Sequence, residues 1–127
     1  MRSMMSSAEM KARGYDSDII AAQLRREKAV GEAGPLIAEI ERAFAGVPRP
    51  MITVSVANGL DVEAHLSAKE IEELRASDPE EIWMQLDDEA LEDFADNCDF
   101  MDSPAWQFYL PAYMSECLRN FPGSCVN

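Results

Sequence analysis

The 127-residue sequence has little of what metal and nucleophilic sites need. His65 is the only histidine, so neither a multi-histidine zinc site nor a two-histidine iron site can be built. Cys98, Cys117 and Cys125 are odd in number and lack the C-x-x-C spacing of zinc and redox motifs. A glycine-rich phosphate loop and a G-x-S-x-G elbow are also missing. We therefore expect no metal, no cofactor and free thiols.

Long apolar runs are missing too. No window approaches the roughly 20 apolar residues of a membrane helix, and residues 1–7 are not followed by the apolar core of a signal peptide. We expect a cytoplasmic protein that binds no membrane. The length fits one domain. Because residues 1–15 are polar and without period, we predict a flexible N-terminal arm over 1–15 and a single globular domain over 16–123.

Basic residues are scarce in the second part of the chain. Residues 1–49 hold eight Lys or Arg and seven Asp or Glu, a net charge of +1, whereas residues 50–127 hold three and seventeen, a net charge of −14. The two values sum to −13. Such a field repels nucleic acid and anionic membranes. It favours a basic protein surface, or a cation, as the partner.

Apolar spacing and capping residues predict a series of short helices. The first helix is expected to start at Ser17 or Asp18 and stop near Gly31, and the second to start at Pro35 after Gly34 and stop near Gly46. The third starts at the capping box Ser67-Ala68-Lys69-Glu70. The fourth starts at Asp78-Pro79, with Ile82, Trp83 and Leu86 facing inward, and the fifth at Asp87 or Asp88.

Residues 51–57 predict a β element. Ile52, Val54 and Val56 alternate with smaller or polar residues, as in a half-buried strand. Asn58-Gly59 is the preferred central pair of a hairpin turn, with residues 60–66 as the possible return strand. Asp61 could instead cap a helical segment. We predict an α+β, α-rich fold in which five to six short helices pack with a small two- or three-stranded antiparallel β element.

The charge-free run 106–114 has two interpretations. Its large residues, with those beyond it, follow the spacing of one helical stripe. Pro111 opposes a helix, since proline costs about 3 kcal/mol in a helix interior. We favour a strand over 106–110, able to pair with 51–57, and a helix from Pro111 to near Asn120; one kinked helix is the alternative. The expected core contains Phe44, Trp83, Phe94, Tyr109, Leu110 and Tyr113.

The block Phe108-Tyr109-Leu110-Pro111-Ala112-Tyr113-Met114 resembles the mark of a family of small bacterial proteins of uncharacterised function. The similarity extends to Ile40–Phe44, Val47-Pro48 and Ile82–Leu86, and so covers roughly residues 35–121. Gln107 stands where the resemblance leads us to expect an arginine. The resemblance implies a compact domain of bacterial or phage origin and implies no activity, ligand or catalytic residue.

The segment from Asp61 to Asp102 is strongly acidic, with sixteen carboxylates against Lys69 and Arg75. In the predicted fifth helix, like charges recur at four-residue spacing, and each such pair costs roughly 0.2–0.5 kcal/mol. A basic partner or a bound cation would relieve this repulsion. The plainer interpretation is a solvated acidic face, partly compensated by Arg25, Arg26 and Lys28. An EF-hand is excluded because the required glycine is missing.

We therefore hypothesise a non-enzymatic domain that binds a basic protein surface, as an inhibitor, an immunity-type protein or a nucleic-acid mimic. Its acids would steer association and an aromatic would anchor it. The proposed contact residues are Glu89, Glu92, Asp93, Asp96 and Trp106. One alternative is a small hydrolase or metal-dependent enzyme that uses clustered carboxylates with His65 or a cysteine. Another is an accessory domain of a larger complex.

Overall fold

The computed structural model describes residues 5–120, and these residues form an all-helical protein. The helices are α1 (Ser7–Ala12), α2 (Ser17–Ala43), α3 (Val54–Val62), α4 (Ala68–Ala76), α5 (Asp88–Asn97) and α6 (Ser103–Arg119), with the 3₁₀ turns η1 (Trp83–Gln85) and η2 (Cys98–Phe100). Residues 5–120 contain no strand, so the predicted α+β fold with its antiparallel element is wrong. None of the described helices has a stretch long and apolar enough to cross a membrane.

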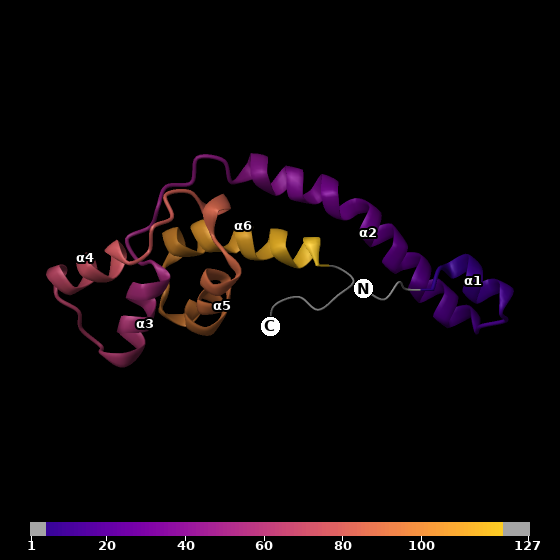
Figure 1. Cartoon of the computed structure of the whole chain (residues 1–127), viewed down its shortest axis with the longest axis horizontal. Coiled ribbons are helices and arrows are strands. Elements are labelled where there is room, and N and C mark those ends of the chain that lie inside the picture. The colour runs from indigo at the N-terminus through magenta and orange to yellow at the C-terminus, as the bar shows by residue number, and fades with distance from the viewer. Residues whose placement is uncertain (1–4, 121–127) are drawn as a thin grey trace.

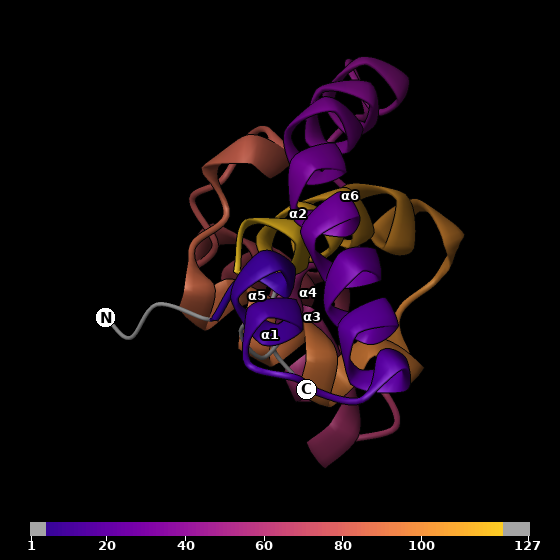
Figure 2. The ribbon, with the colours of Figure 1, turned by 90° about the vertical axis from the view of Figure 1, so that its right-hand side faces the viewer.

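The molecule is elongated along α2. The C-terminal half of α2 lies over α6. The helices α3 and α5 lie near the start of α6, and α4 packs on α3 (Figure 1). The N-terminal half of α2 projects beyond this body with α1 folded back on it. Figure 2 shows this projecting end facing the viewer. The short α1 lies within the region for which we predict a flexible arm.

Aromatic rings hold the body together. Phe94 of α5 stacks on Tyr109 of α6 at 5.7 Å between ring centroids, and Tyr109 meets Phe108 edge-on at 5.2 Å. The indole N–H of Trp83 donates to the carbonyl of Phe44 at 3.0 Å, which ties η1 to the end of α2. Of the residues expected in the core, Trp83, Phe94 and Tyr109 belong to the buried cluster, while Phe44, Leu110 and Tyr113 pack against it partly buried.

The predicted strand over 51–57 is instead the start of α3, with Thr53 as N-cap. The phenol oxygen of Tyr109 accepts a hydrogen bond from the N–H of Val54 at 3.1 Å, and Asp78 Oδ2 accepts from the N–H of Ser55 at 3.0 Å. These two acceptors satisfy donors that a helix start leaves open. Because β propensities span only about 1 kcal/mol, caps supplied by distant residues outweigh the β-branched composition.

Asn58-Gly59 lies inside α3 and forms no hairpin, and residues 60–66 form the end of α3 and a loop, so the predicted return strand is wrong. Gly59 serves helix packing. A Cβ at this position would lie 2.8 Å from Leu74 Cδ1 and 3.2 Å from Leu66 Cδ1. Glycine thus lets α4 and the loop before it approach the backbone of α3 closely.

Residues 103–119 form one continuous helix, so the favoured strand over 106–110 is wrong and the single-helix alternative is correct. Asp102 Oδ1 accepts from the N–H of Ala105 at 3.1 Å, and Pro104 occupies the first turn. Pro111 sits within the helix and is buried. The helix tolerates it because burying Phe108 and Tyr109, at roughly 1.5–3 kcal/mol for each side chain, exceeds the proline cost of about 3 kcal/mol.

The two predicted helices over 17–31 and 35–46 are one helix, α2. A residue before proline is kept from helical backbone largely by a clash that involves its Cβ, and Gly34 has none. Pro35 is exposed, so water reaches the side of the helix where its missing N–H leaves a carbonyl unpaired. Past the end of the helix, Gly46 takes a left-handed conformation with φ of 78°.

The other start signals had mixed outcomes. The Ser67 capping box and the Asp87 N-cap are confirmed at α4 and α5. The helix predicted from Asp78-Pro79 is wrong, because only the single turn η1 forms there and the Asp78 carboxylate caps α3 instead. In that turn Trp83 is buried as predicted, whereas Ile82 is exposed.

Candidate functional site

One face of α5 carries a row of four carboxylates. Glu89, Glu92, Asp93 and Asp96 are spaced by three, one and three residues, which places them along one side of the helix. Glu89, Glu92 and Asp96 are exposed and Asp93 is half-buried. The other side of α5 buries Leu91 and Phe94 in the core. We call the four carboxylates the acidic stripe.

The stripe is electrostatically strained. Partial burial of Asp93, followed by repulsion from Glu89 and Asp96 and from the more distant Asp78 and Asp87, raises the pKa of its carboxyl above the usual value. The ion pairs that the structure shows within residues 5–120 use acids outside the stripe. These acids are Glu39, Glu72, Glu73, Glu81 and Glu116.

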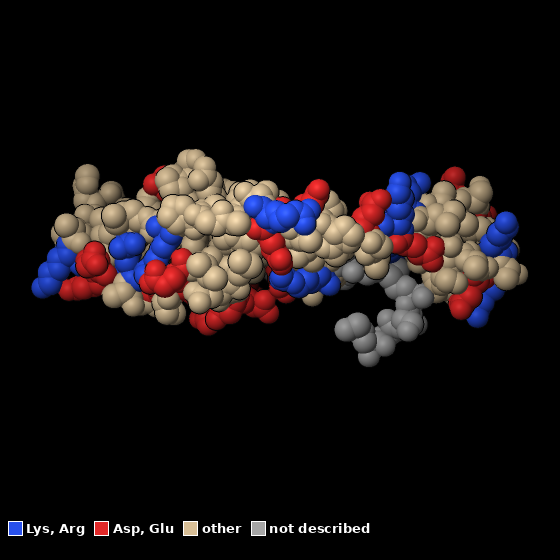
Figure 3. Space-filling model, turned by 90° about the horizontal axis from the view of Figure 1, so that it is seen from above, with Lys and Arg blue, Asp and Glu red and all other residues tan. Residues whose placement is uncertain are grey.

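The basic residues expected to compensate this face lie elsewhere. Arg25, Arg26 and Lys28 belong to the N-terminal half of α2, which projects beside α1 at the far end of the molecule from α5 (Figure 1). Figure 3 shows blue and red side chains interspersed along the part of the surface formed by α1 and the start of α2. The acidic stripe therefore receives no direct neutralisation from this cluster.

Trp106 lies against the helix that carries the stripe. Its ring meets that of Phe94 edge-on, with centroids 5.0 Å apart and planes at 78°. The side that does not face Phe94 is open, and the residue keeps 37% of its surface exposed. Four of the five predicted contact residues therefore lie on one side of α5, whereas Trp106 of α6 meets Phe94, which faces the core from the other side of α5. Carboxylates and an open indole each attract cationic side chains.

The residues expected in a catalytic alternative are spread out. His65 is exposed in the segment between α3 and α4. Cys98 begins η2, and its thiol donates to the carbonyl of Ala95 at 3.8 Å. Within residues 5–120, no group of three or more His, Cys, Asp or Glu side chains is placed to hold a metal ion.

A polar network at the start of α3 had no counterpart in the sequence predictions. The hydroxyl of Ser55 donates to Asp78 Oδ1 at 2.7 Å, and the hydroxyl of Ser77 lies 3.1 Å from that of Ser55. Arg49 donates to the carbonyl of Asp78 at 2.8 Å. These bonds join the start of α3 to Ser77 and Asp78, and Arg49 holds Asp78 from the segment before the helix. The local signal, Asp78-Pro79, correctly marked Asp78 as a cap but not the helix that it caps.

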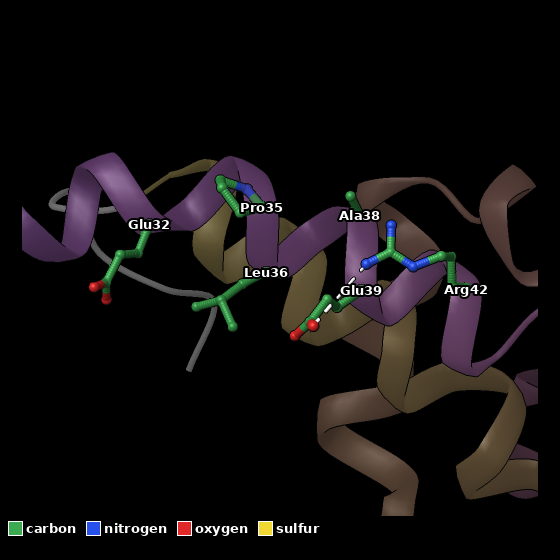
Figure 4. Close-up of a pocket in the computed structure, with 6 residues that line it drawn as sticks. All are labelled: Glu32, Pro35, Leu36, Ala38, Glu39 and Arg42. Atoms are coloured by element: carbon green, nitrogen blue, oxygen red, sulfur yellow. Dashed lines mark ion pairs between the residues drawn. The ribbon is translucent and has the colours of Figure 1, made fainter.

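Surface hollows lie away from the acidic stripe. One, of about 310 Å³, is lined by α1 and the first half of α2, and another, of about 420 Å³, runs along α2 (Figure 4). The lining residues of this second hollow all come from that helix, namely Glu32, Pro35, Leu36, Ala38, Glu39 and Arg42. A third, of about 110 Å³, lies beside Trp83 between α2, α5 and α6. None of these hollows is lined by His65, Cys98 or a residue of the stripe.

Fold and surface together define a small all-helical protein that presents an acidic helix face. Residues 32–124 match the model of a family of unknown function, DUF6714, and the chain belongs to this family. The matched region contains the block 108–114 that suggested a resemblance, and it begins inside α2. No curated protein and no solved structure matches the chain.

Proposed function

We propose that the protein is a non-enzymatic binding domain whose acidic stripe captures a basic protein surface. The observation that carries this proposal is the unneutralised row of Glu89, Glu92, Asp93 and Asp96 on a helix anchored by its opposite face. A cationic partner would relieve the repulsion within the row, and charge of one sign would speed the encounter. An inhibitor, an immunity-type protein and a nucleic-acid mimic are the forms that such a domain would take, in the cytoplasm.

Trp106 supplies the apolar contact with the same partner. Interface energy concentrates in a few aromatic and arginine residues surrounded by contacts that exclude water. An arginine of the partner that lies on the open side of the indole would add a cation–π contact. The stripe therefore sets the association rate, while Trp106 contributes to the lifetime of the complex.

The test compares two quadruple variants of the full chain in pull-downs from the native cell extract. The first neutralises the stripe by Glu89→Gln, Glu92→Gln, Asp93→Asn and Asp96→Asn. The second removes the same amount of charge from exposed acids elsewhere, by Glu32→Gln, Asp61→Asn, Glu63→Gln and Asp99→Asn. Captured proteins are identified by mass spectrometry, and their affinity is then measured at increasing salt.

The proposal predicts that the stripe variant loses the partner and the salt dependence together. The control variant should keep both, and both variants should show the helical circular dichroism of the wild type. Trp106→Ala should shorten the lifetime of the complex with little change in its salt dependence. Equal capture by the wild type and the stripe variant would refute the proposal, and equal loss in both quadruple variants would reduce it to an effect of net charge.

A further inference from the structure

The projecting end of the molecule is a helical hairpin, formed by α1 and residues 17–31 of α2. We call residues 5–31 the N-terminal hairpin. Hydrogen bonds join the two parts of the hairpin: the backbone N–H of Ser7 donates to Glu27 at 3.1 Å, and the side-chain amide of Gln23 donates to the carbonyl of Met5 at 3.0 Å. Gln23 is also its one buried residue among those described. The hairpin therefore has no apolar core of its own.

Large apolar side chains of this hairpin face water. Leu24 keeps 54% of its surface exposed, Ile19 47% and Val30 45%. Isolated helices of about 15 residues are marginal in water, and most helix stability in proteins comes from packing. In Figure 1, α6 underlies only the other half of α2. Leu24 is the most exposed of the three, and it gains stability when another helix covers its side of α2.

The charge order along this part of α2 is self-complementary. Asp16 and Asp18 precede Ala22, and Arg25 and Lys28 follow it, while Glu27 among the bases is taken up by its bond with Ser7 of α1. When two copies of a segment with acids first and bases last lie antiparallel, each acidic end meets a basic end. The same segment placed parallel would set like charges side by side.

We propose that the N-terminal hairpin pairs with a second copy of this chain, through antiparallel α2 helices related by a twofold axis at the level of Ala22. This axis sets Leu24 opposite Ile20 of the second copy and Lys28 opposite Asp16 of the second copy. It also brings Arg25 within one residue of Asp18 of the second copy. Each pairing occurs twice, as in an isologous twofold interface.

The faces of the helix agree with this register. Ile20 and Leu24 are four residues apart and share one side, and Asp18 and Arg25 are seven apart and share another. A twofold axis perpendicular to both helices places each side of one helix next to the same side of the helix in the second copy. Leu24 therefore meets Ile20, and Arg25 meets Asp18. Asp16 and Lys28 lie about 120° apart around the helix and add only longer-range attraction. The small Ala21 between these two sides permits close approach of the backbones.

The distribution of net charge favours the N-terminal hairpin as the part that contacts a second copy. Residues 1–31 hold six basic and four acidic residues, a net charge of +2, whereas residues 32–127 hold five and twenty, a net charge of −15. Because of this charge, residues 32–127 of two copies would repel each other at short range. Antiparallel hairpins place these two parts at opposite ends of the dimer. The acidic stripe on α5 takes no part in the contact, so this inference does not rest on the proposed function.

The first test measures mass in solution by sedimentation equilibrium, from micromolar to millimolar chain. The wild type should pass from 14.2 kDa to twice that mass. Leu24→Glu should raise the dimer dissociation constant by about 10–100-fold, because burial of a leucine side chain is lost in each copy. Val62→Glu is the control, since Val62 is 83% exposed on α3 at the other end of the molecule. Circular dichroism checks that each variant stays helical.

The second test reverses charges. One variant makes the pairing segment acidic by Arg25→Glu and Lys28→Glu, and the other makes it basic by Asp16→Lys and Asp18→Lys. Each alone should dimerise more weakly than the wild type, whereas an equimolar mixture should form a heterodimer.

Other results overturn the proposal. A wild type that stays monomeric at millimolar concentration would do so, as would a Leu24→Glu variant that dimerises like the Val62→Glu control. Association of the basic variant that disappears when the acidic stripe is neutralised would assign the hairpin to α5 of another copy. Antiparallel pairing would also be contradicted if the two charge variants, when mixed, dimerised no more tightly than either variant does alone.

Discussion

The phenol oxygen of Tyr109 accepts a hydrogen bond of 3.1 Å from the backbone N–H of Val54. This bond joins the middle of α6 to the first residue of α3, across 55 positions of the sequence. Its neighbour, the bond from the Ser55 N–H to Asp78, serves the next donor of the same helix. The start of α3 is thus held by side chains from two other segments.

Replacing Tyr109 by phenylalanine should destabilise the fold by about 1–3 kcal/mol, because the N–H of Val54 is then buried without an acceptor. The ring and its stacking on Phe94 are kept. Urea unfolding of the two proteins measures the difference. Tyr15→Phe makes the same change on an exposed residue between α1 and α2, and a loss from it as large as that from Tyr109→Phe would contradict the assignment.

Tyr109 should also make stability depend on alkaline pH. Burial raises the pKa of its phenol well above the usual value of about 10, and the hydrogen bond from Val54 only partly opposes this. The unfolded chain then loses this proton at a lower pH than the folded protein. The unfolding free energy should fall above pH 10, by up to about 1.4 kcal/mol per pH unit from this residue. The fall should be shallower in Tyr109→Phe.

Asp78→Ala should cost about 1–2 kcal/mol, since the N–H of Ser55 at the start of α3 loses its acceptor. Asp61→Ala removes an exposed acid from the same helix and should change stability by no more than about 0.5 kcal/mol. Thermal unfolding, followed by circular dichroism, compares the two. Equal effects would mean that the loss reflects charge and not the cap.

Two glycines of α2 should respond differently to alanine. Gly31 lies in the helix with open space around it, so Gly31→Ala should stabilise the protein by about 0.5–1 kcal/mol. Gly34 is equally open, but it precedes Pro35, and a Cβ there would meet the proline ring. Gly34→Ala should therefore give no gain. Denaturation midpoints of the two variants decide between this account and one based on propensity alone.

Asp93→Asn should stabilise the protein at neutral pH by about 0.5 kcal/mol, because it removes the repulsion from Glu89 and Asp96. The raised pKa of Asp93 means that the folded state binds this proton more tightly than the unfolded chain does. The stability gained from protonation is present at acidic pH and is lost as pH rises through the folded pKa. The advantage of Asp93→Asn should accordingly vanish at acidic pH, and high salt should reduce it.

Local signals predicted local features of this protein. The Ser67 capping box and the Asp87 N-cap act within a few residues, and both are as expected. The spacing of the α5 carboxylates likewise follows from helix geometry. Asp102 and Pro104 form a helix start of the same kind. The sequence alone does not show whether the core buries enough of α6 to offset the cost of Pro111.

The errors came from contacts that sequence spacing does not contain. Val54 and Val56 have β propensity, yet Tyr109 and Asp78 provide caps that make them helical. Asn58-Gly59 has the composition of a hairpin turn, but in the structure Gly59 lies in α3, where its missing Cβ lets Leu74 pack against the helix. The separation of the acidic stripe from Arg25 and Lys28 also depended on tertiary structure, since it follows from the continuity of α2.

That continuity has a mechanical consequence. A helix of 27 residues is about 40 Å long, so α2 is a lever with one end in the body and the other in solvent. The projecting part, residues 17–31, is about 22 Å long, so a tilt of about 10° where α2 leaves α6 would move its free end by about 4 Å. The angle at which α2 packs on α6 thus determines the position of the first turn of α2.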